Sequence, residues 1–201
     1  MLLLLVNYKD EIDYEYFSRY DFVDIKILNE KKWSIFALKL LKLLSENKYD
    51  MVLHFWLCGG KNEEMIWNIY KIDRTFLFYK DIIDNQRFKN WWFNFDSLPN
   101  SNIVTKFKID ENPAKLYDFA EIFDLETFWV SQISNQTLIP IFTLKWVSDT
   151  NDIVQKKDFH IYLKNNIKIV KSNLKIFYEK EFLWFYKRFT TDREFKKKFY
   201  I

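Results

Sequence analysis

Two acidic side chains in the second half of the chain are placed where an α/β protein could use them for chemistry. Glu126 belongs to the stretch Asp124–Phe128, which has the pattern of a helix start, and Asp149 comes just after the apolar run Ile141–Val147. An open α/β sheet builds its ligand site at the ends of its strands. A carboxyl group held there can give or take a proton in a reaction. These two residues are therefore the first candidates for a functional site.

Each candidate acid also has an ordinary structural interpretation. Asp149 could be a turn residue or a helix cap, and Glu126 could simply complement the dipole of a helix N-terminus. Glu11, a third candidate near the start of the chain, stands among Asp10, Asp13 and Glu15. A run of exposed charges explains Glu11 as well as a catalytic role does, so the residues alone leave these alternatives open.

Length and composition bound the class of protein. The chain has 201 residues, of which 49% are hydrophobic and 20% aromatic, so it can bury a core and is not disordered. Its 31 basic and 28 acidic residues nearly balance, whereas a nucleic-acid-binding protein should carry a clustered excess of positive charge. We expect one domain over residues 1–201, with C-terminal helices from about residue 158, and no nucleic-acid partner.

The numbers of cysteines and glycines and the lengths of the apolar runs indicate where the protein works and which ligand sites it can have. Cys58 is the single cysteine, so an intrachain disulfide is impossible and a cytoplasmic location is expected. The N-terminal run Leu2–Val6 is too short for a signal peptide, and no run is long enough to span a bilayer. Gly59 and Gly60 are the only glycines, so no phosphate-cradling loop is recognisable. His54 stands in an apolar run and is expected in the core. We predict no cofactor, no metal and no membrane partner.

The order of apolar runs and helical patterns predicts the fold class. Unalternating apolar runs are typical of strands buried on both faces. Helical periodicity separates them, and Asp124 is a plausible N-cap for the second helix. We therefore predict an α/β fold: a three-layer αβα domain with a central mixed, largely parallel sheet. The expected strands are Leu2–Val6, Phe22–Leu28, Met51–Leu57, Arg74–Tyr79, Ile103–Phe107 and Ile141–Val147, and the expected helices are Ser34–Glu46, Asp124–Asn135 and Asp158–Arg188.

Several stretches resemble the nucleoside phosphorylase superfamily, and most closely the methylthioadenosine/S-adenosylhomocysteine nucleosidases. Asp124-Leu125-Glu126 stands where that family has an acidic residue, Met and Glu. Ile139-Pro140-Ile141 introduces the next strand as in the family, and Val147-Ser148-Asp149 matches the Ser-Asp pair at the end of that strand. The resemblance covers most of the chain and is densest in this last third.

The resemblance implies a role for each matching residue. Asp149 would donate a proton to the purine N7, Glu126 would accept hydrogen bonds from ribose hydroxyls, and Glu11 would activate the attacking water. Leu125 replaces the Met that packs on the ribose. The remaining substrate-binding positions implied by the family are Phe107, Ser148 and Gly59, and Trp91, Phe93 and Leu98-Pro99 resemble the segment that lines the pocket for the 5′ substituent, often at a dimer contact.

The resemblance predicts an N-ribosyl hydrolase that cleaves a purine nucleoside or thionucleoside to free base and sugar. Hydrolysis is favoured over phosphorolysis because Phe55–Cys58 and Lys31–Trp33 do not supply a phosphate cradle. These same stretches depart from the small residues of the family. The alternative is therefore a catalytically degenerate member that acts as a nucleoside-binding or protein-interaction module. The expected partners are a small-molecule purine nucleoside and a second copy of the chain in a homodimer.

Overall fold

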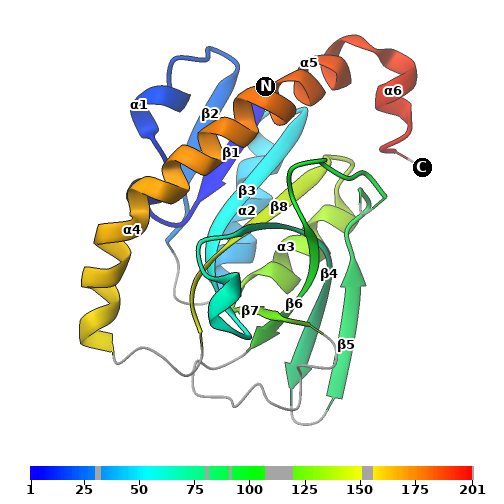
Figure 1. The fold of residues 1–201 in the computed structure, drawn as a ribbon. Coiled ribbons are helices and arrows are strands. Elements are labelled where there is room, and N and C mark those ends of the chain that lie inside the picture. Colours follow the sequence, from blue (N-terminus) through cyan, green and yellow to red (C-terminus); the bar gives the residue numbers. More distant parts are fainter. Residues whose placement is uncertain (30–32, 80–81, 91, 107–119, 151–155, 201) are drawn as a thin grey trace.

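A mixed sheet of eight strands forms the centre of the computed structural model, which describes all residues except 30–32, 80–81, 91, 107–119, 151–155 and 201 (Figure 1). Its order is β2-β1-β3-β7-β6-β4-β5, and β8 pairs with both β3 and β4. The strands are β1 Leu2–Val6, β2 Val23–Ile27, β3 Met51–Gly60, β4 Ile69–Tyr79, β5 Ile82–Arg87, β6 Asn100–Lys106, β7 Ile122–Asp124 and β8 Ile141–Thr150.

The strands closest to the candidate acids run parallel. β1 pairs in parallel with β2 and β3, and β3 pairs in parallel with β8. β4 is antiparallel to β8, and β7 is antiparallel to β3. Because β8 joins β3 to β4, the strands β3, β7, β6, β4 and β8 close into a ring. The parallel arrangement brings the ends of β1, β3 and β8 to the same edge of the sheet.

Helices cover both faces of this sheet, which gives the predicted three layers. Helices α4 and α5 cross one face, and α2 and α3 lie behind the strands in Figure 1. The helices are α1 Tyr14–Phe17, α2 Trp33–Glu46, α3 Thr127–Gln136, α4 Lys156–Phe177, α5 Leu183–Thr191 and α6 Arg193–Lys197, with 3₁₀ turns at Lys9–Glu11 (η1) and Glu63–Met65 (η2) and a π-helical segment at Tyr178–Phe182 between α4 and α5.

Two large cores hold the layers together, and a third cluster is small. On the α4 side, alternate residues of β1, β3 and β8 pack against the terminal helices through a dense aromatic cluster. Phe93 and Phe95 join this cluster, and the Phe93 and Phe185 rings lie 4.4 Å apart. On the other face, Leu3, Val52 and Val147 pack against α2 and α3. Strands buried on both faces explain why their sequences are apolar without alternation.

The predicted fold class is confirmed, and the structure corrects some boundaries. All six expected strands are present, but β5 and β7 are additional. Asp124 is the last residue of β7 and not the N-cap of the following helix, a position taken by Glu126. The reason is a tertiary one, because β7 pairs with both β3 and β6. Within the described ranges, no helix is long and apolar enough to cross a membrane.

Candidate active site

A β-bulge at the end of β8 sets the position of Asp149. The register of β3 and β8 pairs Cys58 with Val147 and then Gly59 with Asp149, so Ser148 is the extra residue. The Ser148 hydroxyl donates to the Cys58 carbonyl at 3.3 Å and to Asp149 Oδ1 at 3.0 Å. Bulges commonly re-aim a side chain beside a functional site. Here the bulge fixes Asp149 next to Gly59.

Glu11 is buried, which removes its interpretation as an exposed charge. Its exposed fraction is 1%, although neighbouring Asp10 is exposed. It lies on η1, just after β1, and its Oε2 accepts hydrogen bonds from the amides of Asn7 at 2.8 Å and Tyr8 at 2.9 Å. Its Oε1 makes no hydrogen bond of normal geometry with the described part of the chain, although the Leu57 backbone is near enough to favour the carboxylate.

Burial raises the pKa of Glu11 from 4.5 to about 7. The loss of water around the carboxylate is the largest cause, and it outweighs the Tyr8 and Asn7 amides and the positive charge of Lys145, which all favour ionisation. A carboxyl group with a pKa near neutrality can accept a proton and release it again under the same conditions. Glu11 therefore has the acidity that a general base needs.

Glu126 is a second carboxylate with a raised pKa, and it interacts with Glu11. It is the N-cap residue of α3, and its Oε2 accepts a hydrogen bond from the Leu125 amide at 3.3 Å. Its pKa rises to about 7, chiefly through burial and through the negative charge of Asp124, with a further contribution from Glu11; Lys145 opposes the rise. Glu11 is therefore near enough to Glu126 to raise its pKa, so these two predicted residues lie in the same region of the structure.

A buried ion pair lies beneath these carboxylates. Lys145 Nζ is 2.7 Å from Asp124 Oδ2, and the two side chains are 0% and 2% exposed. Asp124 also accepts hydrogen bonds from the Thr105 hydroxyl at 2.8 Å and from the Thr127 amide at 3.0 Å. Lys145 is the residue that the sequence analysis missed. Its signal was a lysine inside the apolar run Ile141–Val147, because a buried lysine must be paired.

Cys58 connects Asp149 with the other carboxylates. Its thiol is influenced by the negative charges of Asp124, Asp149 and Glu126, so all three lie around it. Burial raises the pKa of Cys58 well above its usual value, which makes it a poor nucleophile. His54 is fully buried, and burial lowers its pKa well below its usual value, so it is a neutral core residue as expected.

The remaining predicted positions have mixed outcomes. Phe107 and Trp91 lie outside the described residues. A Cβ atom at Gly59 would be 3.9 Å from Asp149 Oδ1, an ordinary contact, so the close approach that demands glycine is not there. The close approach occurs instead at Gly60, where a Cβ atom would be 2.7 Å from Val147 Cγ1. Among the residues that the structure describes, no group of three His, Cys, Asp or Glu side chains could hold a metal ion.

Solved structures with a similar fold include nucleosidases. The 5′-methylthioadenosine nucleosidase of Arabidopsis thaliana matches with a TM-score of 0.71 and 13% identity, covering 97% of both chains. The Chlamydia trachomatis nucleosidase MTAN, bound to MTA, gives a TM-score of 0.59 at 15% identity over 85% of this chain and 91% of that one. A futalosine hydrolase mutant from Helicobacter pylori gives 0.64 at 12% identity over 87% and 95%.

Sequence comparison adds nothing to this result. No family model matches the chain, and no curated protein matches it. The structural matches therefore carry the conclusion, and at this level of identity they concern the fold. They agree with the resemblance seen in the Asp124–Glu126 and Val147–Asp149 motifs. The chain has the fold of the methylthioadenosine nucleosidases and of futalosine hydrolase.

Proposed function

We propose that this protein is a nucleoside hydrolase of the nucleoside phosphorylase superfamily, which cleaves the N-glycosidic bond of a purine nucleoside or thionucleoside. One observation carries the proposal above the others: Glu11, which stands between the exposed acids Asp10 and Glu15, is buried with a pKa of about 7 and contributes to the raised pKa of Glu126. The nucleosidase fold and the bound MTA and adenine of two Chlamydia trachomatis structures support the substrate class.

The proposed mechanism divides the work between three carboxyl groups. Asp149 donates a proton to the purine N7, so that the base leaves as a neutral molecule and its C–N bond to the sugar breaks. Positive charge then develops on the ribose, and Glu126 stabilises it while accepting hydrogen bonds from the hydroxyls. Glu11 takes a proton from a water molecule, whose oxygen bonds to the anomeric carbon. Attack on the face opposite the departing base inverts that carbon.

The charges of the site favour water over phosphate as the acceptor. Glu11 and Glu126 would repel an incoming phosphate. Lys145 offsets this repulsion only in part, because it is already paired with Asp124. Of the bulky residues before the glycine pair, Phe55 and Trp56 are 0% and 2% exposed and pack into the two cores, and the Trp56 ring lies 5.5 Å from Lys145 Nζ. Their size is accommodated within the fold.

The test is base release from candidate substrates. Purified protein is incubated with methylthioadenosine, adenosylhomocysteine or inosine, each with and without phosphate, and adenine or hypoxanthine is separated by chromatography. We expect release without phosphate, a loss of at least about 100-fold in Glu11→Gln and Asp149→Asn, and unchanged rates in the exposed neighbour Asp10→Asn. Base release only in the presence of phosphate would mean that the protein is a phosphorylase and not a hydrolase.

The same experiment separates the second candidate function. A degenerate member would bind a nucleoside, measured by calorimetry, without releasing its base. If the protein neither releases the base nor binds a nucleoside, both nucleoside functions are refuted.

We further propose that residues 1–201 act as one cytoplasmic domain that forms a homodimer. Large apolar side chains such as Leu138 (72% exposed) and Trp184 (60% exposed) support association without locating the interface. Light scattering of the purified protein tests the dimer.

A further inference from the structure

Asn7 brings a buried hydrogen-bond acceptor next to Glu11. It follows directly after β1, and its backbone amide donates to Glu11 Oε2 at 2.8 Å. Asn7 as a whole is half-buried, but its side-chain oxygen Oδ1 is buried and has no hydrogen-bond partner among the described residues. Covalent geometry keeps Oδ1 within about 5 Å of the Asn7 amide nitrogen, which itself contacts the carboxylate. This acceptor therefore lies in the immediate surroundings of Glu11.

One oxygen of Glu11 itself is in the same situation. Its Oε2 accepts two backbone amides, whereas Oε1 is buried and makes no hydrogen bond of normal geometry with the described part of the chain. Buried acceptors cost free energy unless a donor reaches them. Two such oxygens on the same turn indicate a bound group that donates a hydrogen bond to each. A carboxylate and a carboxamide oxygen both accept, so this group needs two donors.

Water is the group that fits these two acceptors best. It is the smallest molecule with two donors, and the enclosed position favours a small one, because Glu11 is 1% exposed and Asn7 Oδ1 does not reach solvent. Buried waters commonly bind polar groups that the protein leaves unsatisfied. A ribose diol also carries two donors, but the proposed reaction already pairs the sugar hydroxyls with Glu126. The same reaction requires a water at Glu11.

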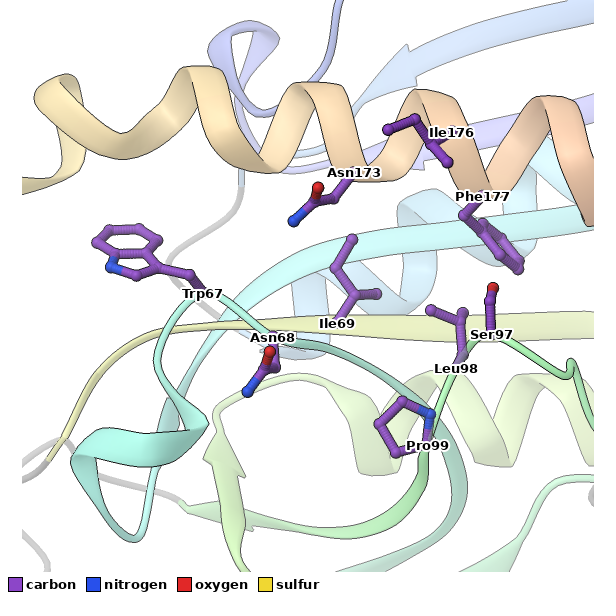
Figure 2. Close-up of a pocket in the computed structure, with 9 residues that line it drawn as sticks. All are labelled: Trp67, Asn68, Ile69, Ser97, Leu98, Pro99, Asn173, Ile176 and Phe177. Atoms are coloured by element: carbon purple, nitrogen blue, oxygen red, sulfur yellow. The ribbon is translucent and has the colours of Figure 1, made fainter.

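A pocket beside α4 lies apart from Asn7 and Glu11. It has a volume of about 250 Å³ and lies between the start of β4, the loop before β6 and α4 (Figure 2). Leu98 and Pro99, which the family resemblance assigns to the 5′ substituent, line it. Neither Asn7 nor Glu11 is among the described lining residues. A change at Asn7 should therefore act on the water and not on the choice of 5′ group.

We propose that Asn7 is a positioning residue, whose carboxamide oxygen accepts one hydrogen bond from the water that Glu11 deprotonates. The proposal rests on the proposed hydrolase function and adds a residue that the family resemblance does not name. The water donates one hydrogen to each oxygen, so its lone pair is free to attack the anomeric carbon. The hydrogen on the Glu11 side passes to Oε1 as the new C–O bond forms, and the electrons of the C–N bond leave with the base that Asp149 protonates. The other hydrogen stays on the new sugar hydroxyl.

A crystal structure of the full chain tests the position of the water. We expect an ordered water about 2.6–3.2 Å from both Asn7 Oδ1 and Glu11 Oε1. It should be lost in Asn7→Leu, which has a side chain of similar shape without an acceptor. An electron-density map with no water in contact with both oxygens would overturn the proposal. This measurement does not depend on turnover.

Kinetics test the role of the water. Asn7→Leu removes one hydrogen bond to the reacting water, so kcat for base release should fall about tenfold while KM stays unchanged. The fall should be the same for every nucleoside that the protein cleaves. Asp10→Leu is the matched control, because Asp10 is an exposed polar residue in the turn that follows Asn7, and it should change neither constant. Equal rates in Asn7→Leu and Asp10→Leu would overturn the proposal.

The choice of nucleophile gives a readout that a purely structural role would not change. With methanol in the reaction, attack by methanol yields a methyl glycoside in place of the free sugar. Asn7→Ala leaves room for the methyl group, so its share of methyl glycoside should rise at least about tenfold over that of the wild type and of Asp10→Leu. The product ratio reports on the nucleophile whichever step limits kcat. An unchanged ratio would mean that Asn7 does not contact the nucleophile.

Asn7→Asp is the conservative variant, because it keeps the shape of the side chain and the acceptor. Its added negative charge beside Glu11 should raise the pKa of Glu11. The acidic limb of the kcat/KM profile should therefore move to higher pH, and a wild-type profile would contradict the proposed contact. Failure to release base from any nucleoside would refute the proposed function and this role together. Base release with unaltered kinetics in Asn7→Leu would refute the role of Asn7 alone.

Discussion

Replacing Lys145 with Met tests whether the buried ion pair stabilises the region beneath the carboxylates. The Lys145 ammonium is 2.7 Å from Asp124, and both side chains are almost fully buried. Breaking a buried pair by removing one partner costs about 3–5 kcal/mol, because the other charge stays buried without compensation. Met preserves the length of the side chain, so packing losses are small. Asp124 keeps its hydrogen bonds to Thr105 and Thr127, which places the expected loss near 3 kcal/mol, at the lower end of that range.

Urea unfolding at pH 7 measures this loss. For a chain of 201 residues, about 3 kcal/mol corresponds to a fall of roughly 6–12 °C in Tm. The double variant Lys145→Met/Asp124→Asn has no buried charge at this position, so we expect it to be more stable than Lys145→Met alone. Lys26→Met is the matched control, because Lys26 pairs with Asp24 at 3.0 Å but is 43% exposed. It should cost less than about 1 kcal/mol.

Two outcomes would refute this reasoning about Lys145. The first is an equal effect of Lys145→Met and Lys26→Met, which would mean that burial does not strengthen the pair. The second is a failure of Asp124→Asn to restore stability in the Lys145→Met background. That result would mean that the loss came from packing and not from an uncompensated negative charge. Either outcome would also weaken the assignment of Lys145 as the residue that favours ionisation of Glu11 and Glu126.

Three further predictions concern pH, backbone strain and close packing. Folding raises the pKa of Glu11 from 4.5 to about 7, so the free energy of unfolding should fall as the pH rises through this range. Urea unfolding at pH 4 and pH 8 measures this fall, and it should be about 3 kcal/mol smaller in Glu11→Gln than in the wild type. Trp67→Gly should be more stable than Trp67→Ala by about 1 kcal/mol, because only glycine relieves the positive φ; equal urea midpoints would contradict strain. Gly60→Ala should cost about 1–3 kcal/mol through its clash with Val147, whereas Gly59→Ala should leave the thermal midpoint nearly unchanged.

The strands that build the site could be predicted because burial on both faces leaves a direct trace in the sequence. β1 matches the expected Leu2–Val6, and β3 and β8 extend a few residues beyond the expected ends. The extensions contain the glycine pair and Ser148-Asp149. These residues are small or polar, so they do not continue the apolar run by which a buried strand is recognised in the sequence. The bulge between β3 and β8 has no signal in a single sequence, because it is a property of the register between two strands.

Asp124 shows why part of the site could not be predicted. An acidic residue before a helical pattern indicates an N-cap, and the Asp124 carboxylate does accept the Thr127 amide at 3.0 Å. The capping chemistry is therefore present, although the residue belongs to β7. A strand of three residues is too short to show periodicity. What determines its role is the pairing with Lys145, which lies in another strand.

The resemblance to nucleosidases predicts which acids form the site, and it says nothing of their state of charge. A sequence places Glu11 in an acidic run, and exposed acids have a pKa near 4.5. The pKa of about 7 arises because the turn after β1 folds back, so that the Asn7 and Tyr8 amides hold the carboxylate inside the protein. This depends on the packing of η1 beneath α4. Pattern and spacing carry no information on that packing.

If the chain carries out the proposed hydrolysis, the charges around Cys58 would favour the transition state over the bound substrate. In the described part of the site, Lys145 pairs with Asp124, and Glu11 and Glu126 each have a pKa of about 7. Ionising both is therefore costly, because the positive charge of Lys145 is shared with its partner Asp124. In the proposed reaction, cleavage of the glycosidic bond would create a further positive charge on the sugar, which would stabilise both carboxylates at once. Because this interaction is absent from the neutral substrate, it would lower the barrier without tightening ground-state binding.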